Sequence, residues 1–215
     1  MKRAAKIYLF DFDGTLVNSM PTFGSVMQRI LDENGISYGD DIIKIITPLG
    51  YRGTAEYFKR MGAEPSVDEL VEKMHAYMQT EYEYSIGEKP TVIKTLRALK
   101  ERGASLNILT ASPHSALDPC LKRLGIFELF DNVWSCEDFG TTKQDTGIYR
   151  AAAERIGAPI DEVIFVDDNI GAVSTAASAG MIAYGIYDKS SDDMVEQMKK
   201  IGSRYIVTFS ELLNE

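Results

Sequence analysis

Short apolar runs alternate with longer helical segments along this chain of 215 residues, and this alternation limits the fold more than any other feature. Six runs have the length and β-branched content of strands: KIYLF, SLNIL, NVWSC, EVIFV, MIAYGIY and RYIVTF. The residues between them have mostly helical spacing. The pattern predicts an α/β fold, with a doubly wound parallel sheet covered by helices on both faces. Ligands of such sheets bind beyond the carboxyl ends of the strands.

After the first predicted strand the strand signal almost disappears. The segments PTFGSVMQRILDENG, TAEYFKRMG and SVDELVEKMHAYMQTEYEYS carry helical spacing instead. We therefore expect a helical subdomain, residues 19–87, inserted into a core formed by residues 1–18 and 88–215. Its hinges are expected at residues 19–21 and 85–90, where glycine, proline and polar residues gather.

The composition argues against several kinds of partner. A formal net charge of -9 repels nucleic acid and anionic lipid, and no apolar run approaches the roughly 20 residues of a membrane helix. The two cysteines, Cys120 and Cys136, form no C-x-x-C pair, so neither a disulfide framework nor a zinc cluster is indicated. We expect a cytoplasmic monomer or dimer whose partner is a small molecule.

Polar side chains follow four of the predicted strands, where they would meet at one edge of the sheet. They are Asp11, Thr110, Ser112, Lys143, Asp167 and Asp168. Three carboxylates from two strands form the hard oxygen site that Mg²⁺ prefers. A divalent cation and Lys143 would offset the repulsion among these carboxylates and allow a phosphorylated anion to bind.

Residues suited to a phosphoryl group surround the predicted carboxylates. The hydroxyl groups of Thr110 and Ser112 can donate to phosphoryl oxygens. Ser112 followed by Pro113 is typical of an N-cap and first helical position, which would direct a helix N-terminus at the same anion. Gly14 and Thr15 allow a tight turn that brings the backbone close to a ligand.

Four sequence segments, in chain order, carry a family resemblance. DFDGTLVNS, LTAS, Lys143 and VDDN resemble the four motifs of the haloacid dehalogenase-like superfamily, in its phosphoglycolate phosphatase and β-phosphoglucomutase branch. The helical insertion resembles the small cap of that family, and the resemblance spans nearly the whole chain. It implies a Rossmann-like core and a magnesium-dependent phosphatase acting on a small phosphorylated metabolite.

The resemblance also implies roles for the aspartates. Asp11 would attack phosphorus and become an aspartyl phosphate, and Asp13 would act as the acid and then the base. Mg²⁺ would be held by the carboxylates of Asp11 and Asp168 and by the backbone carbonyl of Asp13. Asp167 would act on the metal through water.

The remaining roles concern the substrate. Thr110 would hold a phosphoryl oxygen, and Lys143 would neutralise the charge shared by the nucleophile and the transferred group. Further contacts to the substrate are expected from Gly14, Thr15, Ala111 and Ser112. Arg52, in the glycine-flanked cap loop PLGYRG, would reach the leaving group, although a solvated surface position would suit this arginine equally well.

Purely structural explanations exist for several of these residues. Asp167 and Asp168 could cap the helix expected to start near Ile170. Lys143 could be a solvated lysine, because Gln144 and Thr146 replace the two prolines that often flank it in the family.

Several functions remain open beside a phosphatase of the phosphoglycolate or sugar phosphate type. A nucleotide or pyrophosphate hydrolase is one. A β-phosphoglucomutase-like mutase is another, although Phe23 stands where that mutase has a histidine. Asp13 argues against carbon–halogen cleavage. A phosphorylatable signalling domain would carry its acidic pair on the first strand, whereas this chain has a lone DxD there. An idle binding module would usually lack Asp11 or Asp13.

Overall fold

The computed structural model describes residues 6–214 of the chain. They form two compact units: one consists of the residues up to Asn18 together with those from Gly87 onward, and the other of Ser19–Ile86. The first unit contains the residues expected for the core and also Gly87, which was expected in the helical insertion. Residues 1–5 and 215 lie outside the described residues. That the second unit serves as a cap stays a prediction.

The first unit is built on a single parallel sheet of six strands in the order β3-β2-β1-β4-β5-β6. The strands are β1 (Ile7–Phe10), β2 (Ser105–Thr110), β3 (Asn132–Ser135), β4 (Val163–Asp167), β5 (Ile182–Ile186) and β6 (Arg204–Ile206). All six coincide with the apolar runs of the sequence. The predicted doubly wound, Rossmann-like α/β fold is confirmed.

Strand β1 lies where the strand order reverses, between β2 and β4. Its last residue, Phe10, is in register with Ile108 of β2 and Val166 of β4. The main-chain N–H of Asp11 extends this pairing by donating to the Val166 carbonyl at 2.9 Å. The carboxyl ends of β1 and β4 therefore lie side by side, at the position where doubly wound sheets bind ligands.

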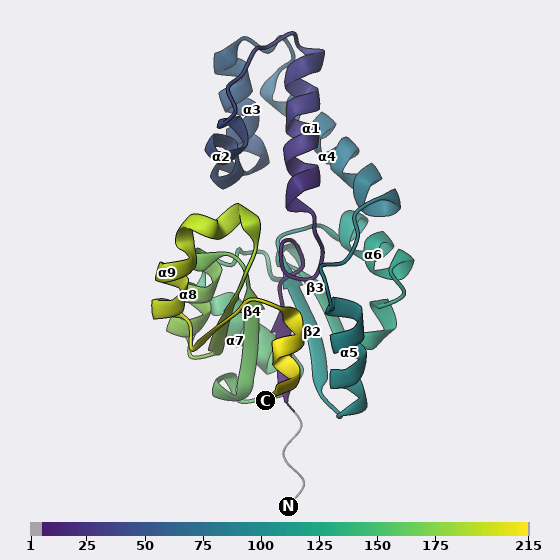
Figure 1. Ribbon diagram of the computed structural model, residues 1–215, viewed down its shortest axis with the longest axis vertical. Helices are drawn as coiled ribbons and strands as arrows, with labels where there is room; N and C mark the ends of the chain where they lie inside the picture. Colours follow the sequence, from purple (N-terminus) through teal and green to yellow (C-terminus); the bar gives the residue numbers. More distant parts are fainter. Residues whose placement is uncertain (1–5, 215) are drawn as a thin grey trace, which may run out of the picture. The chain divides into compact units, whose positions relative to one another are not determined.

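Helices flank the sheet of the first unit on its two faces (Figure 1). They are α5 (Val92–Glu101), α6 (His114–Arg123), α7 (Thr146–Ile156), α8 (Ile170–Ala179) and α9 (Val195–Ile201), with short 3₁₀ turns η2 (Phe127–Leu129), η3 (Cys136–Phe139), η4 (Ile160–Glu162), η5 (Lys189–Met194) and η6 (Phe209–Asn214).

The alternation of side chains along β1 supplies both halves of the core. Leu9 belongs to a buried cluster with Tyr149 of α7 and Val173 of α8. Its neighbour Phe10 points to the other face and packs on Phe209 of η6, with ring centroids 5.2 Å apart. Because both faces are buried, β1 and β4 are apolar until they reach the aspartates at their carboxyl ends.

The second unit is helical. It contains α1 (Met20–Glu33), α2 (Ile42–Ile46), η1 (Thr47–Leu49), α3 (Gly50–Met61) and α4 (Val67–Tyr84). Helix α4 packs against both α1 and α3, and fully buried side chains such as Met27, Phe58 and Met74 fill the interior. Ser66 and Glu69 form a capping box that starts α4.

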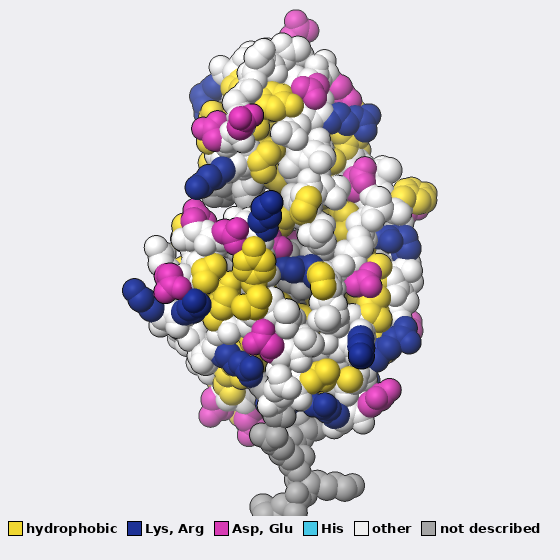
Figure 2. Space-filling view, viewed as in Figure 1, with side chains coloured by type: hydrophobic (Ala, Val, Ile, Leu, Met, Phe, Trp, Pro, Cys, Tyr) yellow, Lys and Arg dark blue, Asp and Glu magenta, His cyan; other side chains and the backbone are white. Residues whose placement is uncertain are grey.

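The surface carries both signs of charge. On the face shown in Figure 2, acidic and basic side chains are interspersed, so the net negative charge is not gathered into one large patch there. Within residues 6–214, no helix combines the length and the hydropathy that a membrane-spanning segment requires.

Candidate active site

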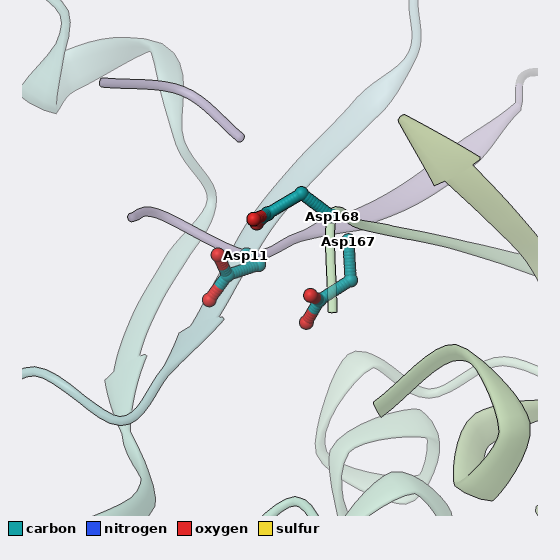
Figure 3. A group of neighbouring side chains, drawn as sticks. All are labelled: Asp11, Asp167 and Asp168. Atoms are coloured by element: carbon teal, nitrogen blue, oxygen red, sulfur yellow. The ribbon is translucent and has the colours of Figure 1, made fainter. Parts of the chain in front are cut away.

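Three aspartates meet at the carboxyl ends of β1 and β4 (Figure 3). Asp11 follows β1, Asp167 is the last residue of β4, and Asp168 comes next. One carboxylate oxygen from each lies within 4.8 Å of the other two, and all three residues are buried. The predicted cluster of carboxylates from two strands is thus present in the structure.

Lys143 joins this cluster from the loop between η3 and α7. Its ammonium group donates to Asp11 Oδ1 and, at 2.9 Å, to Asp167 Oδ2. Its side chain is largely buried, so it is not a solvated surface lysine. The Tyr149 hydroxyl lies 3.0 Å from the Lys143 carbonyl and 3.1 Å from that of Ala172, which anchors the lysine's loop to α7 and α8.

Burial and mutual repulsion shift the ionisation of these groups. The pKa of Asp11 is raised to about 7: burial is the largest cause, Lys143 opposes it, and the charges of Asp167 and Asp13 add to it. Burial, followed by the charges of Asp167 and Asp11, raises the pKa of Asp168 well above its usual range. Burial opposes the charge on Lys143, but Asp11 and Asp167 outweigh it and raise the pKa of Lys143. The cluster has more negative charge than its lysine can balance.

Asp13 lies two residues beyond Asp11 and has a different partner. Its Oδ2 accepts a 2.6 Å hydrogen bond from the Ser112 hydroxyl, which follows β2. The expectation that Ser112 caps α6 was wrong: α6 begins at His114, Pro113 occupies the N-cap position, and no side chain caps the helix. Pro113 has an extended backbone, which leaves the Ser112 side chain available to Asp13.

The other predicted phosphoryl contacts lie near these aspartates. Thr110 is buried, and its Oγ1 accepts a hydrogen bond from the Ser112 amide at 3.1 Å. Ala111 lies between them and is exposed. The Thr15 hydroxyl donates to Asp168 Oδ1 at 3.2 Å. Gly14 adopts φ of +74°, and a Cβ there would lie 2.5 Å from Asp168 Oδ2, so the turn requires glycine.

Asn169 settles whether the aspartate pair merely caps the following helix. Its Oδ1 accepts hydrogen bonds from the Gly171 and Ala172 amides, which makes Asn169 the N-cap of α8. Asp167 Oδ1 accepts a hydrogen bond from the backbone N–H of Asn169, and Asp167 Oδ2 accepts one from Lys143. The carboxylates of this pair are therefore not used as the helix cap.

Arg52 differs from its predicted setting. It lies in the first turn of α3 rather than in a loop, because η1 and α3 follow one another directly. Its guanidinium donates to Asp68 Oδ1 at 2.7 Å, and both side chains are exposed. Its contact with a substrate stays a prediction.

The largely buried Lys89 and the buried Asp188 lie near the site and were not singled out from the sequence. Lys89 donates to the Gly14 carbonyl and to Asp188 Oδ2, the latter at 2.9 Å. Burial opposes ionisation of Asp188, but its hydrogen bonds with Lys89 and Ser190 hold its pKa below the usual value. The proline that follows Lys89 suggested only a hinge, and Asp188 lies in a polar loop with no motif.

Known proteins are similar to this chain in both sequence and fold. Residues 5–180 match the family model described as haloacid dehalogenase-like hydrolase. Pyrophosphatase PpaX of Bacillus velezensis is 31% identical over 187 residues, covering 86% of this chain and 84% of the relative. The phosphorylated carbohydrates phosphatase of Thermotoga maritima is 24% identical over 208 residues, covering 96% and 95%.

A solved structure agrees with the fold. The crystal structure of a "predicted phosphoglycolate phosphatase" from Haemophilus somnus superposes with a TM-score of 0.81 at 20% identity, covering 97% of this chain and 96% of that one. The family model matches most of the chain, and the first relative exceeds 30% identity over more than two thirds of it. The chain therefore belongs to the haloacid dehalogenase-like hydrolases, among relatives that are phosphatases of phosphate esters and pyrophosphate.

Proposed function

We propose that this protein is a magnesium-dependent phosphatase that hydrolyses a small phosphate monoester, of the phosphoglycolate or sugar phosphate type, through an aspartyl phosphate. The observation that supports this most directly is the meeting of Asp11, Asp167 and Asp168 with Lys143, while Asp13 stands beside them on a separate partner. The two carboxylates of the DxD segment thus have distinct surroundings, as a nucleophile and an acid require.

The chemistry of the donor set fits Mg²⁺. The cluster offers only carboxylate oxygens, which are hard ligands, and it is short of positive charge. By the family resemblance, the carboxylates of Asp11 and Asp168 and the backbone carbonyl of Asp13 would hold the ion. Bound there, Mg²⁺ would supply positive charge that stabilises the transferring phosphoryl group.

The first chemical step forms the covalent intermediate. A carboxylate oxygen of Asp11 attacks phosphorus, and the bond from phosphorus to the leaving oxygen breaks. Asp13, in its protonated form, gives its proton to that oxygen, so the alcohol leaves neutral. The Ser112 hydroxyl, bonded to Asp13 Oδ2, orients this carboxyl group.

The second step regenerates the enzyme. Asp13, now a carboxylate, takes a proton from a water molecule whose oxygen attacks phosphorus. The bond between phosphorus and Asp11 breaks, releasing inorganic phosphate and the free Asp11 carboxylate. Lys143, already paired with Asp11, offsets the negative charge that builds up in both steps.

Substrate selection is assigned to the helical unit, Ser19–Ile86, acting as a cap. The residues of the core that carry the chemistry recognise a phosphoryl group and leave the rest of the substrate unspecified. Phe23 in α1 packs edge-on against Tyr51, at 6.0 Å between centroids, and its ring cannot transfer a proton. This favours a hydrolase over a mutase that relies on a histidine at this position.

We also propose a cytoplasmic location. Cys120 and Cys136 are buried, and within the described residues neither forms a disulfide, as expected of a protein kept in a reducing compartment.

The test is phosphate release from a panel of monoesters, with Mg²⁺ or with EDTA, for the wild type and Asp11→Asn. We expect Mg²⁺-dependent release by the wild type and a loss of about 10³-fold or more in Asp11→Asn, because the amide is a poor nucleophile. Release that continues in EDTA, or that survives the substitution, would overturn the proposal.

Pyrophosphate hydrolysis is a second candidate, favoured by the 31% identity to pyrophosphatase PpaX. The same site would serve, because Asp11 would attack one phosphorus and the other phosphate would leave. Including pyrophosphate in the panel separates the two: a kcat/KM for pyrophosphate above that of every monoester would select this function.

A further inference from the structure

One buried lysine of the first unit has no part in the steps above. The side chain of Lys89 is 13% exposed and that of Asp188 is 6% exposed. The ammonium group donates to the Gly14 carbonyl, to the Tyr187 carbonyl at 2.6 Å and to Asp188 Oδ2 at 2.9 Å. A lysine ammonium has three N–H groups, so each has an acceptor. Lys89 therefore ties together three segments that are far apart in the sequence.

The most consequential of these acceptors is the Gly14 carbonyl, which belongs to the turn after Asp13. This turn lies directly against Asp168: a Cβ on Gly14 would lie 2.5 Å from Asp168 Oδ2, and Thr15 donates to Asp168 Oδ1. Lys89 holds the peptide unit that joins Gly14 to Thr15. The hydrogen bond thus fixes the backbone that follows Asp13, whose carbonyl is assigned to the metal, and that contacts Asp168, a second residue assigned to it.

The backbone of Lys89 is itself attached to the segment that follows this turn. Its N–H donates to the Leu16 carbonyl at 2.9 Å. Glu88 forms an antiparallel bridge with Val17. Lys89 therefore holds the turn from a segment already bonded to the end of that turn, which leaves the turn little freedom to shift.

Charge gives Lys89 a second effect. Burial, Asp167 and Asp11 are the main causes of the raised pKa of Asp168, and the charge of Asp188 raises it further, while that of Lys89 lowers it. Without Lys89, Asp188 would be a buried, unpaired carboxylate next to a cluster that already repels itself.

We propose that Lys89 is a positioning residue for the magnesium site, which sets the turn after Asp13 against Asp168 by donating to the Gly14 carbonyl. This inference rests on the proposed function. Lys89 acts through Gly14. Removing the Lys89 ammonium group should weaken Mg²⁺ binding by about 10- to 100-fold, the range typical of groups that orient metal ligands. Turnover at saturating Mg²⁺ should fall much less.

The first experiment is calorimetric titration of the full chain with MgCl₂ alone, so that metal binding is measured apart from catalysis. Lys89→Met, which keeps the length of the side chain without its charge, is compared with the wild type. Lys94→Met is the matched control, because Lys94 is exposed on α5. We expect a weaker Mg²⁺ affinity for Lys89→Met alone, and a higher Mg²⁺ concentration for half-maximal phosphate release.

A second set of variants separates the effect of the hydrogen bond from Lys89 to Gly14 from the effect of the ion pair between Lys89 and Asp188. It also keeps the test valid if Lys89→Met alone does not fold. Asp188→Asn leaves Lys89 free to bond Gly14, and we expect Mg²⁺ affinity within about threefold of the wild type. The double variant Lys89→Met with Asp188→Asn removes the unpaired buried carboxylate that threatens folding. Its Gly14 carbonyl still lacks the donor, so its affinity should stay at least about tenfold weaker.

The outcomes distinguish this inference from the proposed function. Wild-type Mg²⁺ affinity in Lys89→Met, or in the double variant, overturns the positioning role while leaving the phosphatase intact. A wild type that neither binds Mg²⁺ nor releases phosphate overturns the proposed function, and this inference with it.

Discussion

At the scale of single residues, the three adjacent polar side chains at the end of β4 each have a different partner. Asn169 caps α8 through its amide oxygen. Asp167 pairs with Lys143, and Asp168 turns toward Gly14 and Thr15. Because a neutral amide does the capping, both charged groups remain available to a cation. The arrangement makes the contact between Gly14 and Asp168 one of the tightest constraints on the site.

Gly14→Ala tests that constraint. The new methyl group would lie within 2.7 Å of three atoms of the Asp168 carboxyl group, and φ of +74° disfavours any side chain. We expect a loss of about 1–3 kcal/mol in the free energy of unfolding together with weaker Mg²⁺ binding. Thermal unfolding and a calorimetric Mg²⁺ titration measure the two effects.

Gly103→Ala is the control for backbone strain. Its φ is +84°, and a Cβ there would meet nothing within 4 Å. It should lose only the part of the stability that comes from backbone strain, and it should keep its Mg²⁺ affinity. Equal Mg²⁺ affinity in both alanine variants would show that the contact with Asp168 is unimportant.

Sequence reasoning reached some site residues and missed others for physical reasons. Asp11 and Asp168 were identified because a charged residue directly after a buried strand has a defined position. The partner of Ser112 was not, because Ser-Pro is a common helix start and the choice between capping and bonding Asp13 depends on a chain segment 99 positions away. Lys89 and Asp188 are likewise joined across 99 positions, and no local pattern announces such a pair.

At the scale of elements, His114 connects α6 to η3. Its Nδ1 lies 2.8 Å from Asp118 Oδ1 within α6, and its Nε2 lies 2.9 Å from Asp138 Oδ2 in η3. Arg155 of α7 donates to the Asp138 carbonyl at 3.0 Å. The hydrogen bonds with Asp118 and then Asp138 raise the pKa of His114 above 6.5.

This contact should make stability depend on pH. A histidine whose pKa is higher in the folded state stabilises that state below about pH 6.5, and the contribution is lost as pH rises through the raised folded value. We expect the difference in Tm between the wild type and His114→Gln to be largest at pH 5.5–6 and to shrink toward pH 8.5. A difference that stays constant over this range would contradict a protonated link.

Element prediction succeeded where one periodicity dominated. The central strands β1, β2 and β4 were readable because they are buried on both faces and give short, mainly apolar runs. The edge strands β3 and β6 are only partly buried, but they too are short and mainly apolar or aromatic. The segment PLGYRG was interpreted as a loop because of its proline and glycines, yet α3 begins at Gly50. Glycine is disfavoured only weakly near a helix start, and packing of α3 on α4 outweighs that preference.

At the scale of the whole molecule, repulsion among the buried carboxylates of the site destabilises the folded state, and metal binding would relieve that repulsion. At an Mg²⁺ concentration 100 times its Kd, the folded state gains about 2.7 kcal/mol. For a chain of this length, this corresponds to a rise in Tm of about 5–10 °C. Differential scanning calorimetry with and without Mg²⁺ measures the increment.

Asp168→Asn should remove both the unfavourable charge of the metal-free site and the stabilisation by Mg²⁺. Removing one buried carboxylate relieves repulsion, so the metal-free protein should unfold at a higher temperature than the wild type. The increment from Mg²⁺ should vanish. Asp161→Asn, an exposed aspartate of η4, serves as the control and should keep the increment. A full Mg²⁺ increment in Asp168→Asn would remove this residue from the metal site.

The two chain segments that leave and re-enter the core are already paired with each other. Val17 and Glu88 form an antiparallel bridge, and the backbone N–H of Asn18 donates to the Gly87 carbonyl at 2.9 Å. Residues Ser19–Ile86 can therefore be treated as one long loop of the core, because the segments on either side of it are hydrogen-bonded to each other. The entropic cost of closing such a loop grows only slowly with its length. That loop can therefore change in length or sequence at little cost to the strands, and under the proposed function such changes would alter specificity while leaving the catalytic residues in place.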